Sequence, residues 1–162
     1  LKKKHNTILD VVFSGGDKGY KQNVIDYAKK LDVFDRIKFV GFISNKELFA
    51  HYKNCFALVM PTFFGPTNIP PLEAFKLGTP VIYSDLEGLR DEIGNTVLRI
   101  DLHDPNSLAN GILNLLENKV LRKNLVEAGF KFYKENEKFD RLNLLNNIIY
   151  NFRIKYSNFR KM

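Results

Sequence analysis

Cysteine and histidine are scarce in this sequence, which has one cysteine, three histidines and no tryptophan among 162 residues. A single cysteine excludes an internal disulfide, and the scattered histidines leave no ligand spacing for zinc. No apolar run approaches the ~18 residues that a membrane-spanning helix needs. Three lysines follow Leu1 without an apolar segment behind them, so we expect no secretory leader. The apolar fraction of 44% predicts a domain with a real core.

Acidic residues are absent from residues 141–162, which carry five basic side chains. Lys2, Lys3 and Lys4 add three more positive charges. Without these two ends, the net charge of +7 falls to −1 for residues 5–140. A nucleic-acid-binding domain concentrates its basic residues on the folded body, so we expect no nucleic-acid partner.

Short apolar runs alternate with amphipathic segments along the chain. The predicted strands are 7–14, 36–42, 55–60, 81–84 and 97–100. The predicted helices are 18–31, a helix opening at 44–47, 72–77, 105–116, 119–136 and 139–160. Residues 44–47 form a predicted capping box, which opens a helix with Leu48, Phe49 and Tyr52 on its apolar face. Gly78 is the predicted stop of the helix 72–77, and Asp104 is the predicted cap of the helix 105–116. The third strand is apolar throughout, which is typical of a strand covered on both faces, and the β-branched, apolar first run predicts a buried strand. The alternation predicts an α/β fold with a Rossmann-like parallel sheet and helices on both faces.

Gly15 and Gly16 directly follow the first predicted strand. The segment 14–19 resembles the dinucleotide-binding pattern GxGxxG, but serine replaces its first glycine. The next strand ends without the acidic residue that would hold a ribose in a dinucleotide fold. These glycines either form a simple turn or approach a ligand, and a nicotinamide dehydrogenase is disfavoured.

The loop that follows the third strand, residues 61–70, is rich in proline and glycine and leads into a helix. Free backbone N–H groups at a helix N-terminus attract phosphate, and Thr67 and Asn68 can add side-chain donors. Pro71 is predicted in the first helical turn, with Glu73 in that same turn. Glu73 either accepts hydrogen bonds from ribose hydroxyls or only stabilises the start of the helix.

Several segments in the same order resemble the donor-binding lobe of retaining family 4 glycosyltransferases, which have the GT-B fold. The similar segments are Ile37–Ser44, Leu58–Thr62, Pro70–Ala74 with Leu77–Ile82, Gly88–Glu92, and Ile100–Asp101 with Asp104. Each segment is short, and it is their combined order that carries the resemblance.

The resemblance implies a binding site for a nucleoside diphosphate sugar, with no cofactor and no metal. Glu73 matches the family's glutamate that binds the nucleotide ribose, and Gly65 stands where the family places a sugar-contacting glutamate. The implied donor nucleotide contacts are Gly41, Phe42, Ile43 and Glu73; the implied diphosphate and sugar loop is Gly65, Pro66, Thr67, Asn68 and Ile69; and Gly15 and Gly16 form the turn after the first strand. No catalytic residue is assigned within the chain.

The resemblance covers one lobe of a GT-B enzyme. Residues 1–138 are expected to form the nucleotide-sugar-binding lobe, incomplete at its N-terminal edge, and residues 139–162 to form a C-terminal helix. The acceptor-binding lobe and the basic residues that grip the diphosphate would lie upstream. The implied function is the donor half of a retaining glycosyltransferase, a bacterial, metal-independent hexosyltransferase that builds a cell-surface glycan. A nucleotide-sugar epimerase and a nucleic-acid-binding domain are the alternatives.

A periodic apolar stripe marks the last predicted helix. It consists of Leu142, Leu145, Ile149, Phe152, Tyr156 and Phe159, spaced alternately by three and four residues. The stripe can dock on the missing lobe, lie on an anionic membrane surface, or remain a solvated helix. The expected location is cytoplasmic, with the inner face of the membrane as a possible site of contact.

Overall fold

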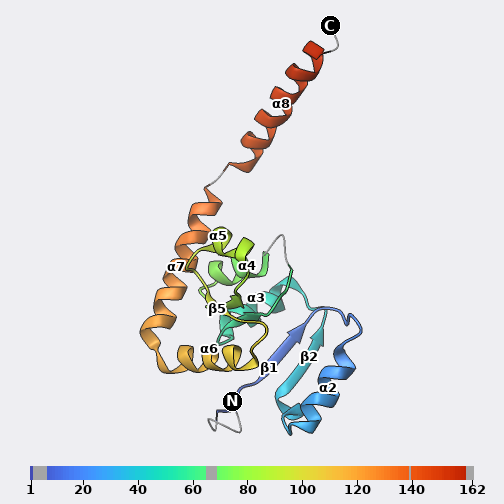
Figure 1. The fold of residues 1–162 in the computed structure, drawn as a ribbon, viewed down its shortest axis with the longest axis vertical. Coiled ribbons are helices and arrows are strands. Elements are labelled where there is room, and N and C mark those ends of the chain that lie inside the picture. The colour runs from blue at the N-terminus through green and yellow to red at the C-terminus, as the bar shows by residue number, and fades with distance from the viewer. Residues whose placement is uncertain (2–6, 65–68, 139, 160–162) are drawn as a thin grey trace.

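Five short strands alternate with helices in the computed structural model, which describes residues 1, 7–64, 69–138 and 140–159 (Figure 1). The strands are β1 (Val11–Ser14), β2 (Ile37–Gly41), β3 (Leu58–Met60), β4 (Val81–Ser84) and β5 (Leu98–Ile100). The helices are α2 (Lys21–Lys30), η1 (Phe34–Arg36), α3 (Asn45–Asn54), α4 (Ile69–Lys76), α5 (Glu87–Ile93), α6 (Pro105–Glu117), α7 (Lys119–Glu137) and α8 (Arg141–Phe159). Among these described helices, none is both long enough and apolar enough to cross a membrane.

The strands form two separate parallel sheets. One sheet pairs β1 with β2, and the other has the order β3-β4-β5. The expected parallel pairing is therefore confirmed, but the strands do not form the one open sheet that the sequence pattern predicted. The first sheet is in register from Val11 opposite Ile37 to Phe13 opposite Phe39, and the register shifts after Phe13.

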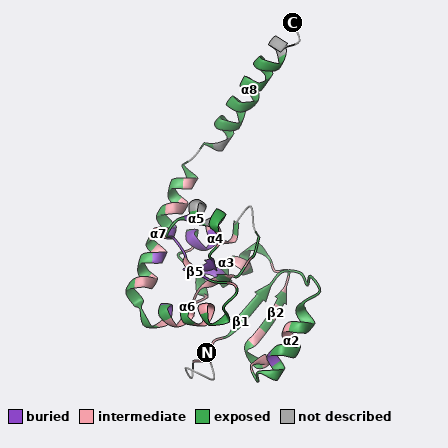
Figure 2. Cartoon of the chain, in the orientation of Figure 1, coloured by how far each residue is buried: buried purple, intermediate pink, exposed green. Residues whose placement is uncertain are grey.

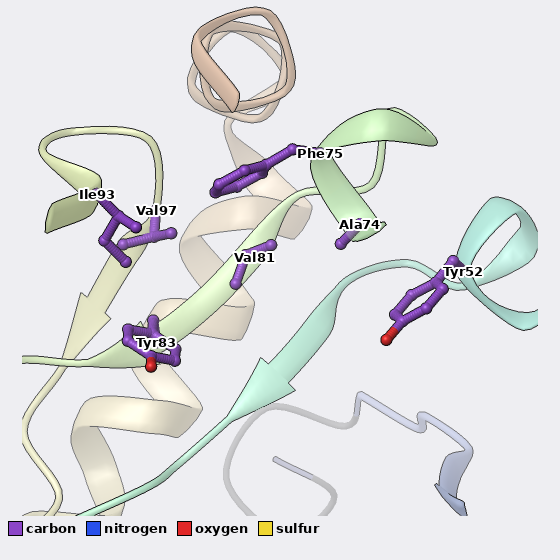
Figure 3. Close-up of a cluster of buried hydrophobic side chains, with 7 residues drawn as sticks. All are labelled: Tyr52, Ala74, Phe75, Val81, Tyr83, Ile93 and Val97. Atoms are coloured by element: carbon purple, nitrogen blue, oxygen red, sulfur yellow. The ribbon is translucent and has the colours of Figure 1, made fainter. Parts of the chain in front are cut away.

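The core is built around β4, the central strand of the larger sheet, whose four residues are all buried. Successive strand side chains point to opposite faces. Val81 and Tyr83 pack on one face with Phe75 and Ala74 of α4 (Figure 3). Ile82 packs on the other face, in a second cluster of buried side chains. That cluster contains Ile82, Ile100, Leu115 and Leu125, the last two from α6 and α7. Helices thus cover both faces of this sheet, as predicted.

Capping residues mark the helix starts where the sequence placed them. The Ser44 hydroxyl accepts a hydrogen bond from the Glu47 amide at 3.3 Å, and the Glu47 carboxylate accepts one from the Ser44 amide at 2.9 Å. Asp104 caps α6 by accepting from the Asn106 amide at 2.9 Å. Gly78 ends α4 with a φ of 74°, a conformation that favours glycine.

Three local predictions were wrong. Helix α4 begins at Ile69, two residues before Pro71, because prolines fit a first turn whose N–H groups have no helical partner. Helix α5 was not predicted, since its short segment lacks a clear apolar stripe. Strand β1 is exposed along its whole length rather than buried, because only β2 pairs with it among the described strands.

Helix α8 projects away from the rest of the molecule (Figure 1). Its described side chains, residues 142–156, are all exposed, which Figure 2 shows along the whole helix. Leu142, Leu145, Ile149, Phe152 and Tyr156 are among them, with exposed fractions between 44% and 74%. The predicted apolar stripe therefore has no covering surface within the described residues.

Candidate functional site

The turns after β1 and β2 meet at the carboxyl ends of these strands. The Gly15 amide donates a hydrogen bond to the Gly41 carbonyl at 2.8 Å. Gly41 has a φ of 66°, which a residue with a side chain rarely adopts. A Cβ atom at Gly16 would lie 2.9 Å from the Phe42 ring, so the ring and the Gly16 backbone are in close contact. The structure thus brings together Gly15, Gly16, Gly41 and Phe42, while Ile43 follows them half-buried.

A hollow of about 370 Å³ lies between this pair of turns and the start of α2. Its lining includes the rings of Phe39 and Phe42 and the side chains of Lys18 and Lys21. The Asp17 carboxylate, also in the lining, accepts hydrogen bonds from the amides of Gly19 and Lys21, and these bonds lower the pKa of that carboxyl. Aromatic rings beside two cations form a surface that can accept a flat, negatively charged ligand.

Glu73 lies in the second turn of α4 rather than in the first, because the helix starts earlier than the sequence predicted. Its carboxylate is half-buried and accepts a hydrogen bond from the Tyr52 hydroxyl at 3.0 Å. The interpretation of Glu73 as a first-turn acid is therefore wrong. The other interpretation, an acceptor for ligand hydroxyl groups, stays a prediction; among the described residues, the Tyr52 hydroxyl donates to this carboxylate.

Tyr52 lies in the last part of α3, and both its side-chain hydroxyl and its backbone carbonyl form hydrogen bonds. Its side chain is 7% exposed and belongs to the core cluster of Figure 3. Its backbone carbonyl accepts a hydrogen bond from the Thr79 hydroxyl at 2.5 Å and another from the Cys55 thiol at 3.3 Å. Burial raises the pKa of the Tyr52 hydroxyl above its ordinary range, and the hydrogen bond to Glu73 and its negative charge raise it further.

The end of β3 is fixed to β4 by one buried hydroxyl. Ser84 accepts a hydrogen bond from the Thr62 amide at 2.7 Å and donates one to the Met60 carbonyl at 3.3 Å. The loop then leads toward Gly65, Pro66, Thr67 and Asn68, which lie outside the described residues. The last predicted residue of this loop, Ile69, is the first residue of α4, and its side chain is 59% exposed.

The described site residues thus fall into two groups. One group lies in the turns after β1 and β2, and the other is Glu73, on the helix that follows β3. No hydrogen bond among the described residues joins Glu73 to the glycine turns after β1 and β2. The described residues contain no group of three or more histidine, cysteine or acidic side chains that could hold a metal ion. Sequence reasoning assigned Tyr52 only to an apolar helix face and missed its hydroxyl contact. The available signal was a tyrosine, rather than a phenylalanine, on a face predicted to be buried.

Parallel strands with helices on both faces define an α/β protein, and similarity to solved structures shows that its fold is like that of GT-B glycosyltransferases. The chain is similar to sucrose-phosphate synthase from Thermosynechococcus elongatus, with a TM-score of 0.73 and 24% identity over 90% of this chain and 38% of that one. It is also similar to HepE from Anabaena in complex with UDP, with a TM-score of 0.71 and 18% identity over 90% of this chain and 41% of that one. At these sequence identities, the similarity to the solved structures applies to the fold alone.

The sequence shows the family. The family described as "Glycosyl transferases group 1" matches residues 1–132, and the chain belongs to it. One relative, an uncharacterized glycosyltransferase of Methanocaldococcus jannaschii, is 30% identical over 141 residues, which are 86% of this chain and 35% of that protein. The O-antigen chain mannosyltransferase RfbU of Salmonella typhimurium is 28% identical over 133 residues, or 81% of this chain and 38% of that protein. The chain thus spans less than two fifths of these relatives.

Proposed function

We propose that this chain is the donor-binding, C-terminal lobe of a retaining glycosyltransferase. The observation that carries the proposal is the Glu73 carboxylate, half-buried in α4 and held at 3.0 Å by the Tyr52 hydroxyl. A carboxylate in that state keeps acceptor positions for two neighbouring ribose hydroxyls. The substrate is a nucleoside diphosphate sugar, and the glycine turns after β1 and β2 with Gly41, Phe42 and Ile43 complete the nucleotide site.

The same lobe binds the diphosphate without a metal ion. The loop of Gly65, Pro66, Thr67 and Asn68 precedes α4, which begins at Ile69. The backbone N–H groups of its residues other than proline, with that of Ile69 at the helix N-terminus, can stabilise the negative charge of the leaving diphosphate. Binding of a nucleoside diphosphate should therefore persist in EDTA. Calorimetric binding that requires added magnesium or manganese would contradict this part of the proposal.

On this proposal, residues 1–138 form a lobe in which one strand of the parallel sheet is missing. Strand β1 pairs only with β2 among the described strands, which leaves its other edge free. Its apolar side chains are also exposed, with Val11, Val12 and Phe13 each 43% or 44% exposed. The outer edge of β3 is unpaired among the described strands as well. One further parallel strand between them would join the two sheets. It would come from the same longer protein, which also supplies the acceptor-binding lobe and the cations that grip the diphosphate.

The C-terminal helix, residues 139–162, docks on the missing acceptor-binding lobe. The exposed stripe of α8 supplies the apolar surface that such an interface needs. The protein works in the cytoplasm, where nucleotide sugars are substrates, and the five basic residues of segment 141–162 suit contact with the inner face of the membrane. The product is a cell-surface glycan, an assignment supported by similarity to the O-antigen chain mannosyltransferase RfbU.

The decisive experiment is a thermal-shift and calorimetric screen of the chain against UDP, GDP, ADP and their common sugar conjugates. A ligand that binds only the native state raises the melting temperature. Glu73→Gln should then weaken binding about 10- to 150-fold, the effect of ~1.5–3 kcal/mol for a hydrogen bond to a charged group. Tyr133→Phe is the matched control, because it removes a similar hydroxyl–carboxylate bond, the 3.1 Å contact with Glu137. Equal binding by Glu73→Gln and the unmodified chain would refute the site.

Activity assays test the division into lobes. The 162-residue chain should transfer no sugar, because half of the interlobe cleft is missing and positioning supplies much of the rate. A longer form that carries both lobes should transfer the sugar with its anomeric configuration retained, which NMR of the product would measure. Transfer by the chain alone would contradict the lobe assignment, and an epimerised nucleotide sugar in place of a transfer product would favour the epimerase alternative.

A further inference from the structure

We propose that Tyr52 is a positioning residue for the donor nucleotide, because its hydroxyl fixes the Glu73 carboxylate in the orientation that accepts the ribose hydroxyls. This inference rests on the proposed function and adds a residue from a different helix to the site. The contact that carries it is the 3.0 Å hydrogen bond from the Tyr52 hydroxyl to Glu73 Oε2.

The hydrogen-bonding capacity of the carboxylate is compatible with this role. An ionised carboxylate offers about four acceptor positions and donates nothing. Tyr52 occupies one position on Oε2, and among the described residues no hydrogen bond reaches Oε1. Two vicinal hydroxyls can therefore still donate to Glu73 while Tyr52 holds it. Without Tyr52, the carboxylate would be free to turn about its terminal torsions, and binding would have to restrict that freedom.

Tyr52 is itself held by packing and hydrogen bonds, as a positioning residue requires. Its ring is 7% exposed and lies in the same core cluster as Ala74 and Phe75 of α4. Its carbonyl is bonded to the Thr79 hydroxyl, which is also buried and lies just after α4. Helix α3 is thus fastened to α4 at Glu73 and to the segment after α4 at Thr79. The Tyr52 hydroxyl is rigid relative to the helix that carries Glu73.

A purely structural hydrogen bond and a positioning bond predict different effects on ribose recognition. If the Tyr52 hydroxyl only stabilises the fold, its loss weakens the binding of ribonucleotides and of 2′-deoxyribonucleotides equally. If the Tyr52 hydroxyl orients Glu73, its loss weakens chiefly the binding of the ribonucleotide, which has both ribose hydroxyls. The ratio of the two dissociation constants therefore isolates the positioning role from stability.

The experiment measures binding of UDP, GDP and ADP, and of each 2′-deoxy counterpart, to the chain and to Tyr52→Phe. The phenylalanine keeps the packed ring and removes only the hydroxyl. We expect Tyr52→Phe to weaken ribonucleotide binding about three- to tenfold, a part of the loss expected for Glu73→Gln. Binding of the 2′-deoxy ligand should change by less than about twofold, so that the discrimination between the two sugars falls.

Two control variants separate the outcomes. Thr79→Val removes the hydrogen bond to the Tyr52 carbonyl but keeps the Tyr52 hydroxyl. It should lower the melting temperature and reduce the ribose discrimination by less than Tyr52→Phe does. Tyr133→Phe should change neither the melting temperature nor the ribose discrimination. In the double variant Tyr52→Phe/Glu73→Gln, the two losses should not add, because both act through one carboxylate.

The possible failures are distinguishable. If the unmodified chain binds no ribonucleotide, or if Glu73→Gln leaves the discrimination intact, the proposed nucleotide site is wrong and this inference falls with it. If Glu73→Gln removes the discrimination but Tyr52→Phe retains it in a folded protein, the nucleotide site stands and Tyr52 is only a core residue. If Tyr52→Phe does not fold, Thr79→Val decides in its place: ribose discrimination that is unchanged in a folded Thr79→Val protein would overturn the positioning role.

Discussion

Gly129 of α7 lies against the ring of Phe75 of α4. A Cβ atom at position 129 would stand 3.0 Å from Cε1 of that ring and closer still to Cδ1. Phe75 is 1% exposed and packs edge-on against Phe132 of α7, with the ring centroids 6.0 Å apart. The close approach of two helix backbones at this point holds α7 over the helix that carries Glu73.

Gly129→Ala should therefore destabilise the protein, although alanine is the better helix former. Overpacking a closed core costs about 1–3 kcal/mol, whereas the helix-propensity gain is about 1 kcal/mol. We expect a net loss of up to about 2 kcal/mol in the free energy of unfolding, measured in urea. Gly88→Ala in α5 is the control, because a Cβ there meets nothing within 4 Å and should be neutral or stabilising. A Gly129→Ala protein at least as stable as the unmodified chain would show that the two helices can separate.

Removal of residues 139–162 should leave the stability of residues 1–138 unchanged within about 0.5 kcal/mol, the usual range for surface changes. The reason is that every described side chain of α8 between residues 142 and 156 is exposed. Thermal unfolding followed by circular dichroism would measure the effect. A fall of many degrees in the melting temperature would mean that the helix packs on this lobe in solution.

The stability of the chain should decline above pH 10 in a way that depends on Tyr52. The folded state raises the pKa of Tyr52, so the unfolded chain releases this proton first as the pH rises. The native state then binds more protons than the unfolded state, and the free energy of unfolding falls by at most about 1.4 kcal/mol per pH unit. Urea titrations between pH 8 and 11 should show a shallower decline for Tyr52→Phe. Parallel declines in the two proteins would contradict the raised pKa.

Asn68→Ala and Thr67→Ala should weaken binding of a nucleoside diphosphate about 10- to 150-fold, the effect of ~1.5–3 kcal/mol for one hydrogen bond to a charged group. Both residues directly precede α4 in the sequence, next to the backbone groups that attract phosphate. Binding of the bare nucleoside should stay the same, because it lacks the phosphates. Unchanged affinity for both ligands would mean that this loop only connects β3 to α4.

The sequence alone determined the local features whose cause lies within a few residues. The capping box at Ser44 and Glu47, the Asp104 cap and the stop at Gly78 formed as predicted, because each needs only neighbouring backbone groups. The order of strands and helices, and the family, followed from apolar spacing and motif order. The position of Glu73 on the helix after the third strand was visible in the same way.

Only the tertiary structure decided what surrounds those features. The apolar pattern of β1 predicted burial, but burial depends on a neighbouring strand, and among the described strands only β2 supplies one. The contact between Tyr52 and Glu73 joins residues 21 positions apart, and no local spacing encodes it. It exists because α3 and α4 pack into one core around β4, where a buried hydroxyl must find an acceptor. The packing of helices on the sheet, rather than any motif, placed the Glu73 carboxylate against the Tyr52 hydroxyl.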